Sequence, residues 1–145
     1  MATQTKQTKQ RSGLESLRRN ATMARLLDAL DRGEDVGHYG RLVFAMVARH
    51  FLDEDELVGW LRKDRDCSEE QARSLYLQVQ GRDYSPPTRE KILEWQRQQD
   101  FQIILNPGDP DQGNVYKDLQ FPDGVYDHIA DYYEDKAEAQ EAQES

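Results

Sequence analysis

The chain has 145 residues, of which 37% are hydrophobic, and this length and composition suit one domain around a single core better than two domains. It carries 28 acidic residues against 19 basic ones, a net charge of −9, so the composition does not favour bulk electrostatic binding of nucleic acid. The only cysteine, Cys67, excludes a disulfide within the chain and any zinc or iron–sulfur site that needs several thiolates.

The two ends of the chain differ in composition from the middle. Residues 1–12 are polar and lack a hydrophobic period, which predicts a flexible tail, and residues 134–145 repeat Glu, Ala and Gln, which predicts a frayed acidic tail. A single helical domain is therefore expected over residues 13–133. No stretch approaches the ~20 apolar residues of a membrane span, and the first residues lack the apolar core of a signal peptide. We expect a cytoplasmic protein with no membrane partner.

The charge is unevenly spread along the chain. Residues 1–20 carry five basic residues and one acidic residue, and residues 129–145 carry six acidic residues and one basic residue. The segment between them therefore holds a net charge of −8 out of the total of −9. The basic start of the chain does not make the predicted domain itself basic.

Apolar residues at spacings of three and four predict helices through the first half of the chain. One helix is expected from Leu14 to Leu30, with a break near Asn20 and a stop at Gly33. A second begins after Gly37 and is the most apolar segment of the chain, which favours a central position.

Capping residues mark the next three helices. Asp53 and Ser68 are each followed three places later by Glu or Gln, the pattern of a capping box, and the helix that starts at Ser68 runs to Gly81. Pro86 and Pro87 cannot be helical, so Thr88 is expected to cap a fifth helix.

The last third of the chain is less regular in pattern. The apolar run from residue 101 to residue 105 fits either the end of the fifth helix or an isolated strand. Residues 106–114 read NPGDPDQGN and predict a loop, and a final amphipathic helix begins near Pro122 and carries Val125, Ile129, Tyr132 and Tyr133. The expected fold class is mainly α, a compact multi-helix domain with flexible termini.

No arrangement of residues predicts catalysis or a bound cofactor. His38, His50 and His128 show no i, i+4 pair that could present two imidazoles to one metal ion. No glycine-rich phosphate loop occurs, and the carboxylates lie at predicted helix starts and faces, with no nucleophile set beside a base. We therefore expect a binding domain and not an enzyme.

Two short runs are candidates for binding, each with a structural alternative. His38 and Arg41 stand at the start of the second helix, where unpaired N–H groups and the helix dipole favour an anion such as phosphate. The alternative is a histidine that caps its own helix and an arginine paired with a nearby carboxylate. Arg82 and Tyr84 could hold a phosphate and stack on a base, or Tyr84 could simply fold back onto the domain.

Four segments between residues 22 and 92 follow one another in the same order as the motifs of a known protein family. These are TMARLLDAL (22–30), HYGRLVFAMVARHF (38–51), the acidic helix over 53–61, and a helix that carries Arg73 and leads to GRDYSPPTR (81–89). Together they resemble the C-terminal domain of the large subunit of archaeal and eukaryotic DNA primase. That family has a cysteine-led helix C-M/I-x-x-L-x-x-A-L, then H-x-x-R opening an apolar helix, and later G-x-x-Y-x-P-x-S-C.

The chain departs from the family at its iron–sulfur ligands. The first two ligand cysteines fall on Thr22 and Arg89, and no cysteine remains beyond Leu93 to supply the other two. The resemblance therefore implies a form without the cluster and without its electron transfer. If the relationship holds, Thr22 and Arg89 should lie close together in the fold.

The resemblance implies an accessory domain that binds a primer–template junction or a single strand in replication initiation. It assigns nucleic-acid contacts to His38, Arg41, Arg73, Arg82 and Tyr84, and it makes a catalytic primase subunit or a polymerase a possible protein partner. The alternative is a helical protein–protein interaction module that has lost nucleic-acid binding. Convergence of the basic side chains on one face would favour the first hypothesis, and their dispersal would favour the second.

Overall fold

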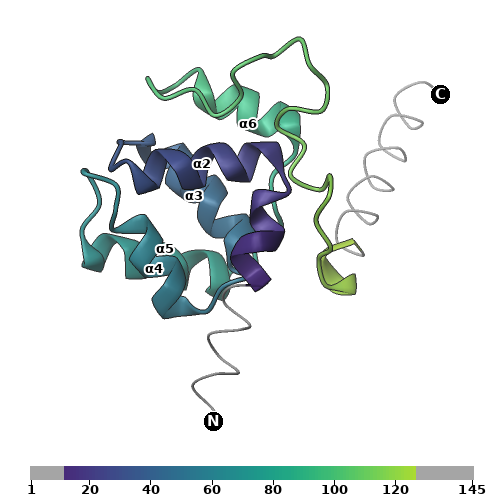
Figure 1. The fold of residues 1–145 in the computed structure, drawn as a ribbon. Coiled ribbons are helices and arrows are strands. Elements are labelled where there is room, and N and C mark those ends of the chain that lie inside the picture. The colour runs from purple at the N-terminus through teal and green to yellow at the C-terminus, as the bar shows by residue number, and fades with distance from the viewer. Residues whose placement is uncertain (1–11, 127–145) are drawn as a thin grey trace, which may run out of the picture.

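The computed structural model describes residues 12–126, and its first helical segment covers residues 12–18. Five helices follow: α2 (Ala21–Asp31), α3 (Gly37–Ala48), α4 (Glu54–Leu61), α5 (Glu69–Gly81) and α6 (Arg89–Gln96) (Figure 1). Residues 12–126 contain no strand, which confirms the mainly α fold class. The predicted tails, apart from Ser12, and the expected domain end over 127–133 lie outside the described residues.

The predicted break near Asn20 is confirmed. Asn20 is the N-cap of α2, where its side-chain oxygen accepts a hydrogen bond from the Met23 amide, so the chain turns here between two helical segments. At the other end, Gly33 has a φ of +74°, which suits glycine and ends α2 as the sequence indicated.

The predicted caps of the later helices are also present. The Asp53 carboxylate accepts a hydrogen bond from the Glu56 amide, and Thr88 caps α6 through the Lys91 amide. Ser68 and Gln71 form a complete capping box, in which each side chain accepts the other residue's backbone N–H. The starts of α4, α5 and α6 are therefore set by local sequence.

Helix α3 lies at the centre of the domain. It contacts α2, α4, α5 and α6, and Figure 1 shows α4 and α5 on one side of the α2–α3 pair and α6 on the other. The six consecutive residues 43–48 are all buried, which confirms the central position expected from the apolar sequence. Trp60 and Trp95 are each half-buried and pack against this core.

Residues 101–105 form neither the end of a helix nor a strand, so both predicted alternatives are wrong. The buried Gln96 side chain holds this segment by accepting a hydrogen bond from the Ile104 amide at 2.7 Å and donating one to the Ile104 carbonyl at 3.2 Å. Its backbone groups are thereby satisfied by a side chain instead of a neighbouring strand. Residues 106–114 are a loop, as predicted.

The last described residues, 115–126, run as a strap along the helical domain and are called the C-terminal strap below (Figure 1). Phe121 of the strap is buried and makes edge-to-face contacts with His50 and Phe51 at the end of α3. Only residues 123–126 of the predicted final helix are described, and they are helical. Among the described residues, no helix has both the length and the apolar character needed to cross a bilayer.

Candidate functional site

The N-terminus of α3 is already capped by side chains of the domain. The Gly37 amide donates to Asp35, and the Tyr39 amide donates to Oε1 of Gln99, each at 2.9 Å. The amide of Val36, the N-cap residue, donates to Oδ2 of Asp64 at 2.9 Å. The donors that would have faced a bound phosphate are therefore largely occupied from within the domain.

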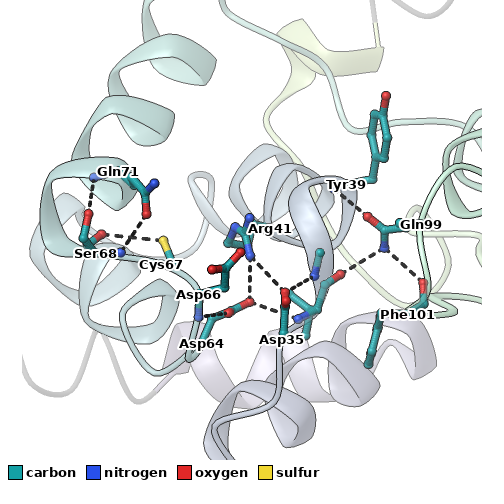
Figure 2. A network of polar contacts seen from close by, with 12 residues as sticks. Asp35, Tyr39, Arg41, Asp64, Asp66, Cys67, Ser68, Gln71, Gln99 and Phe101 are labelled. Carbon is teal, nitrogen blue, oxygen red and sulfur yellow. Dashed lines mark hydrogen bonds and ion pairs between the residues drawn. The ribbon is translucent and has the colours of Figure 1, made fainter.

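Arg41 is held between two carboxylates. Its Nη1 lies 3.0 Å from Asp64 Oδ2 and 3.3 Å from Asp35 Oδ1 (Figure 2). The Asp64 side chain is fully buried, and it also accepts the amides of Val36 and Asp66. The alternative in which Arg41 pairs with a nearby carboxylate is therefore the arrangement present.

His38 is exposed and does not cap the helix, because the N-cap is Val36. Its ring meets Tyr39 edge to face with 5.2 Å between ring centroids, and Tyr39 in turn stacks on Trp95 at 5.5 Å. His38 thus stands at the surface beside an aromatic pair that joins α3 to α6.

His38 and Arg41 do share one surface pocket. It has a volume of about 340 Å³ and lies between the start of α3 and one side of α5, lined in addition by Cys67, Glu70, Gln71, Ser74, Leu75 and Gln78. Burial raises the pKa of the Cys67 thiol, which donates a hydrogen bond to the Ser68 carbonyl. The pocket therefore presents a protonated thiol and not a reactive thiolate.

Arg73 is not among the residues that line this pocket. It is surrounded by Glu69, Asp55 and Glu54, with ion-pair distances of 3.3, 3.4 and 3.5 Å. A hydrogen bond to Glu69, assisted by Asp55, raises the pKa of Arg73. Its charge is thus compensated by helices α4 and α5 themselves.

Arg82 and Tyr84 lie in the turn after α5 and bond to one another, with Arg82 Nη1 donating to the Tyr84 hydroxyl at 3.1 Å. The Tyr84 side chain is half-buried against the core, which matches the alternative in which the tyrosine folds back onto the domain. Neither residue lines the pocket that His38 and Arg41 share.

Arg49 has a structural role that the sequence analysis did not predict. Its side chain is only 6% exposed, and it donates to the Tyr84 carbonyl at 2.9 Å and pairs with Asp83 at 2.8 Å. It therefore fixes the turn after α5 to the end of α3. Its position after a long apolar run gave no local signal of these partners.

Thr22 and Arg89 bond to consecutive residues of the same loop. Thr22 Oγ1 accepts a hydrogen bond from the Gly113 amide at 2.9 Å, and Arg89 Nε donates to the Gln112 carbonyl at 2.8 Å. Arg89 also donates to the carbonyls of Pro107 and Asp109. The two positions at which the resemblance expects cysteines are therefore each hydrogen-bonded to the same loop, at adjacent residues 113 and 112.

Within residues 12–126 no group of three or more His, Cys, Asp or Glu side chains is arranged to hold a metal ion. Comparison of the chain with protein-family models, with curated proteins and with solved structures finds no match in any of the three. The likeness to the primase large subunit thus rests on the sequence motifs alone.

Proposed function

We propose that this domain is a helical protein-interaction module that no longer binds nucleic acid through the residues the resemblance assigns. The observation that carries the proposal is the pairing of Arg41 with Asp35 and Asp64, and of Arg73 with three carboxylates. A cation that is already neutralised by its own domain gains little from a phosphate, because the phosphate must compete with carboxylates held in place.

The distribution of the candidate residues supports the same proposal. His38 and Arg41 share a pocket, whereas Arg73 and Arg82 do not line it, so the assigned residues do not form one basic surface. Residues 12–126 carry 21 acidic and 15 basic residues, a net charge of −6, so no general positive field compensates for the dispersal.

A second candidate function, binding of a primer–template junction or single strand, is favoured by a different observation. Thr22 and Arg89 each bond to residues 112–113, which is compatible with the resemblance, and His38 and Arg41 line one pocket of about 340 Å³. On this candidate the pocket would accept one terminal phosphate group, and a catalytic primase subunit or a polymerase would be the protein partner.

A pair of direct binding measurements separates the two candidates. A peptide library displayed on phage is selected against the full chain, and a 5′-triphosphorylated primer–template is titrated into the same protein at low ionic strength. The interaction module should yield peptides that bind saturably, while the primer–template should show no saturation. His38→Ala serves as the site variant because this exposed side chain can be removed without disturbing the buried Arg41–Asp64 pair.

Saturable primer–template binding that weakens in His38→Ala, and weakens again in Arg41→Ala, would overturn the proposal in favour of the second candidate. Failure to select any saturable peptide would also count against it. The far-ultraviolet circular dichroism of each variant is recorded first, because loss of Arg41 leaves the buried Asp64 without its cation.

A further inference from the structure

We propose that the α3–α5 pocket receives a lysine or arginine side chain from a basic, amphipathic segment of the partner protein. This inference rests on the proposed interaction function and names the chemistry of the partner. It concerns the pocket lined by His38, Arg41 and the α5 side chains, because the exposed side chains of Glu70, Ser74 and Gln78 line it without an internal hydrogen bond or ion pair among residues 12–126.

The α5 wall of the pocket is one continuous helix face. Its lining residues stand at positions 70, 71, 74, 75 and 78, the three- and four-residue spacing of neighbours on a helix surface. Two of them are neutral amides, Gln71 and Gln78, and Leu75 supplies an apolar surface. Such a wall offers hydrogen-bond acceptors along its length and apolar contact for an aliphatic stem.

The charges around the pocket favour a cation. Arg41 is the lining residue with a fixed positive charge, and it faces the carboxylates of Asp35 and Asp64, with Asp66 nearby (Figure 2). Glu70 adds a further carboxylate from α5. Asp35, Asp64 and Asp66 stand behind the lining, and the charges of Asp64 and Asp66 act on Cys67 of the pocket. Arg41 is thus neutralised from behind while Glu70 is not, which opposes a phosphate and favours a basic side chain.

Glu70 is the carboxylate that remains available to a ligand. It is exposed, and its carboxylate makes no hydrogen bond or ion pair within residues 12–126. By contrast, Asp64 already accepts three hydrogen bonds and Asp35 accepts two. Neither carboxylate is therefore free to pair with a lysine or arginine side chain of the partner. The predicted contact is therefore between Glu70 and the incoming cationic group.

The exposed Leu77 next to the pocket indicates that the partner segment also carries an apolar residue. Its side chain is 61% exposed, and it follows Ser74 by three residues and Glu70 by seven, which places it on the rim of the same α5 face. A segment with a basic residue over Glu70 and an apolar residue over Leu77 would cover both features.

The test uses a short fluorescent peptide of lysines and leucines in amphipathic order, and the same peptide with glutamate in place of each lysine. Binding to the full chain is followed by fluorescence anisotropy at low and at physiological ionic strength. Glu70→Gln should weaken binding of the lysine peptide roughly two- to fivefold, as for one exposed ion pair, and should reduce its salt dependence. Leu77→Ser should weaken binding without changing the salt dependence.

Glu90→Gln is the matched control. Glu90 is the second residue of α6, as Glu70 is the second residue of α5, so both changes remove one carboxylate from a helix first turn. Glu90 borders a different hollow, of about 410 Å³, next to Pro110 and Tyr126. Its replacement should leave the affinity of the lysine peptide within error of wild type.

Equal affinities of Glu70→Gln and Glu90→Gln, preferential binding of the glutamate peptide, or no binding of the lysine peptide would each overturn the inference. If displayed-library peptides still bind saturably, the interaction function stands and only the assigned pocket chemistry is wrong. If no peptide binds and primer–template does, the proposed function itself fails.

Discussion

Residues 12–96 and residues 97–126 are held in place by different kinds of interaction. The first part buries apolar side chains that recur at helical spacing, such as Leu26 and Leu30 in α2 and Leu57 and Leu61 in α4. The second part has little regular structure. It also buries apolar side chains, such as Ile104 and Phe121, but in addition it is tied to the helices by side chains that bond to its backbone. Asn20, Arg25, Arg89 and Gln96 all act in this way.

The two parts satisfy the hydrogen-bonding groups of their buried backbone in two different ways. A helix satisfies its own N–H and C=O groups, so its neighbours need only apolar surface. An irregular segment cannot do this, and residues 102–117 instead take donors and acceptors from the helical part. Loss of one apolar side chain should therefore weaken the whole domain, whereas loss of one bonding side chain should release a defined stretch of backbone.

The largest effect is expected from Leu27→Ala in the helical part. Leu27 has no exposed surface, so truncation should lower the free energy of unfolding by about 3 kcal/mol. Urea unfolding followed by circular dichroism and by tryptophan fluorescence should show both transitions shifted together. A loss below about 1 kcal/mol would mean that α2 contributes much less to the core than its burial indicates.

Replacement of Asn20 comes next and acts on both parts. Asn20 caps α2 and donates to the carbonyls of Asn114 and Lys117 at 2.8 and 2.9 Å. Asn20→Ala should cost about 2 kcal/mol, since it removes the cap and leaves two carbonyls without their donor. Asn20→Asp keeps the cap acceptor, but it loses the two donated bonds and sets a carboxylate oxygen against the carbonyls of Asn114 and Lys117.

Hydrogen exchange distinguishes the two Asn20 variants. Both should lose protection over residues 113–119, and only Asn20→Ala should also lose it in the first turn of α2. Uniform loss across the domain in Asn20→Asp would contradict the division into two differently held parts.

The pH dependence of stability probes the contact between the parts. His50 packs against Phe121 of the C-terminal strap, and its Nε2 is buried without a hydrogen-bond partner in the described part of the chain. Burial, together with the adjacent Arg49, lowers the pKa of His50 to about 4, while Asp83 opposes the shift. The unfolded chain binds this proton near its ordinary value of about 6.5.

The stability that neutral His50 contributes is therefore complete above pH 6.5 and falls as the pH drops from 6.5 toward 4. At pH 5 the loss should be on the order of 1 to 2 kcal/mol. Because carboxylates titrate in the same range, the loss is measured as the difference between wild type and His50→Gln, which lacks the titrating ring. Parallel pH profiles for the two proteins would refute the assignment.

The smallest effect is expected from Arg73→Ala. This side chain pairs with three carboxylates at the surface of α4 and α5, where solvent screens the attraction. Its removal should leave the thermal midpoint within error of wild type at physiological salt and lower it only at low salt. A clear loss of stability at physiological salt would show that the surface pairs do structural work in the helical part.

The helical part could be predicted from sequence because its signals are local. Apolar spacing located α3, and the residues Asn20, Ser68 and Thr88 located helix starts to within a residue. Residues 101–105 were mispredicted because the partner that decides their conformation, Gln96, bonds through a side chain that leaves no periodic pattern.

The candidate site was predictable only in outline. The run from His38 to Arg41 drew attention to the right end of α3, and the pairing of Arg41 with Asp35 was within reach of the sequence. Asp64 and Gln99 were not, since they lie 23 and 60 residues away along the chain from the groups they bond, Arg41 and the Tyr39 amide. The α5 wall of the pocket likewise needed the packing of α5 against α3.

Gln99 carries a consequence for the chemical lifetime of the fold. Its Oε1 accepts the Tyr39 amide, while its Nε2 donates to the carbonyls of Val36 and Phe101. Hydrolysis of this amide to a carboxylate would keep the shape and lose both donated bonds, placing a negative oxygen against two carbonyl oxygens. Gln99 thus holds its position only while its side chain has both an acceptor and a donor. Deamidation of this one residue would weaken the attachment of α3 to the irregular segment with almost no change in side-chain volume.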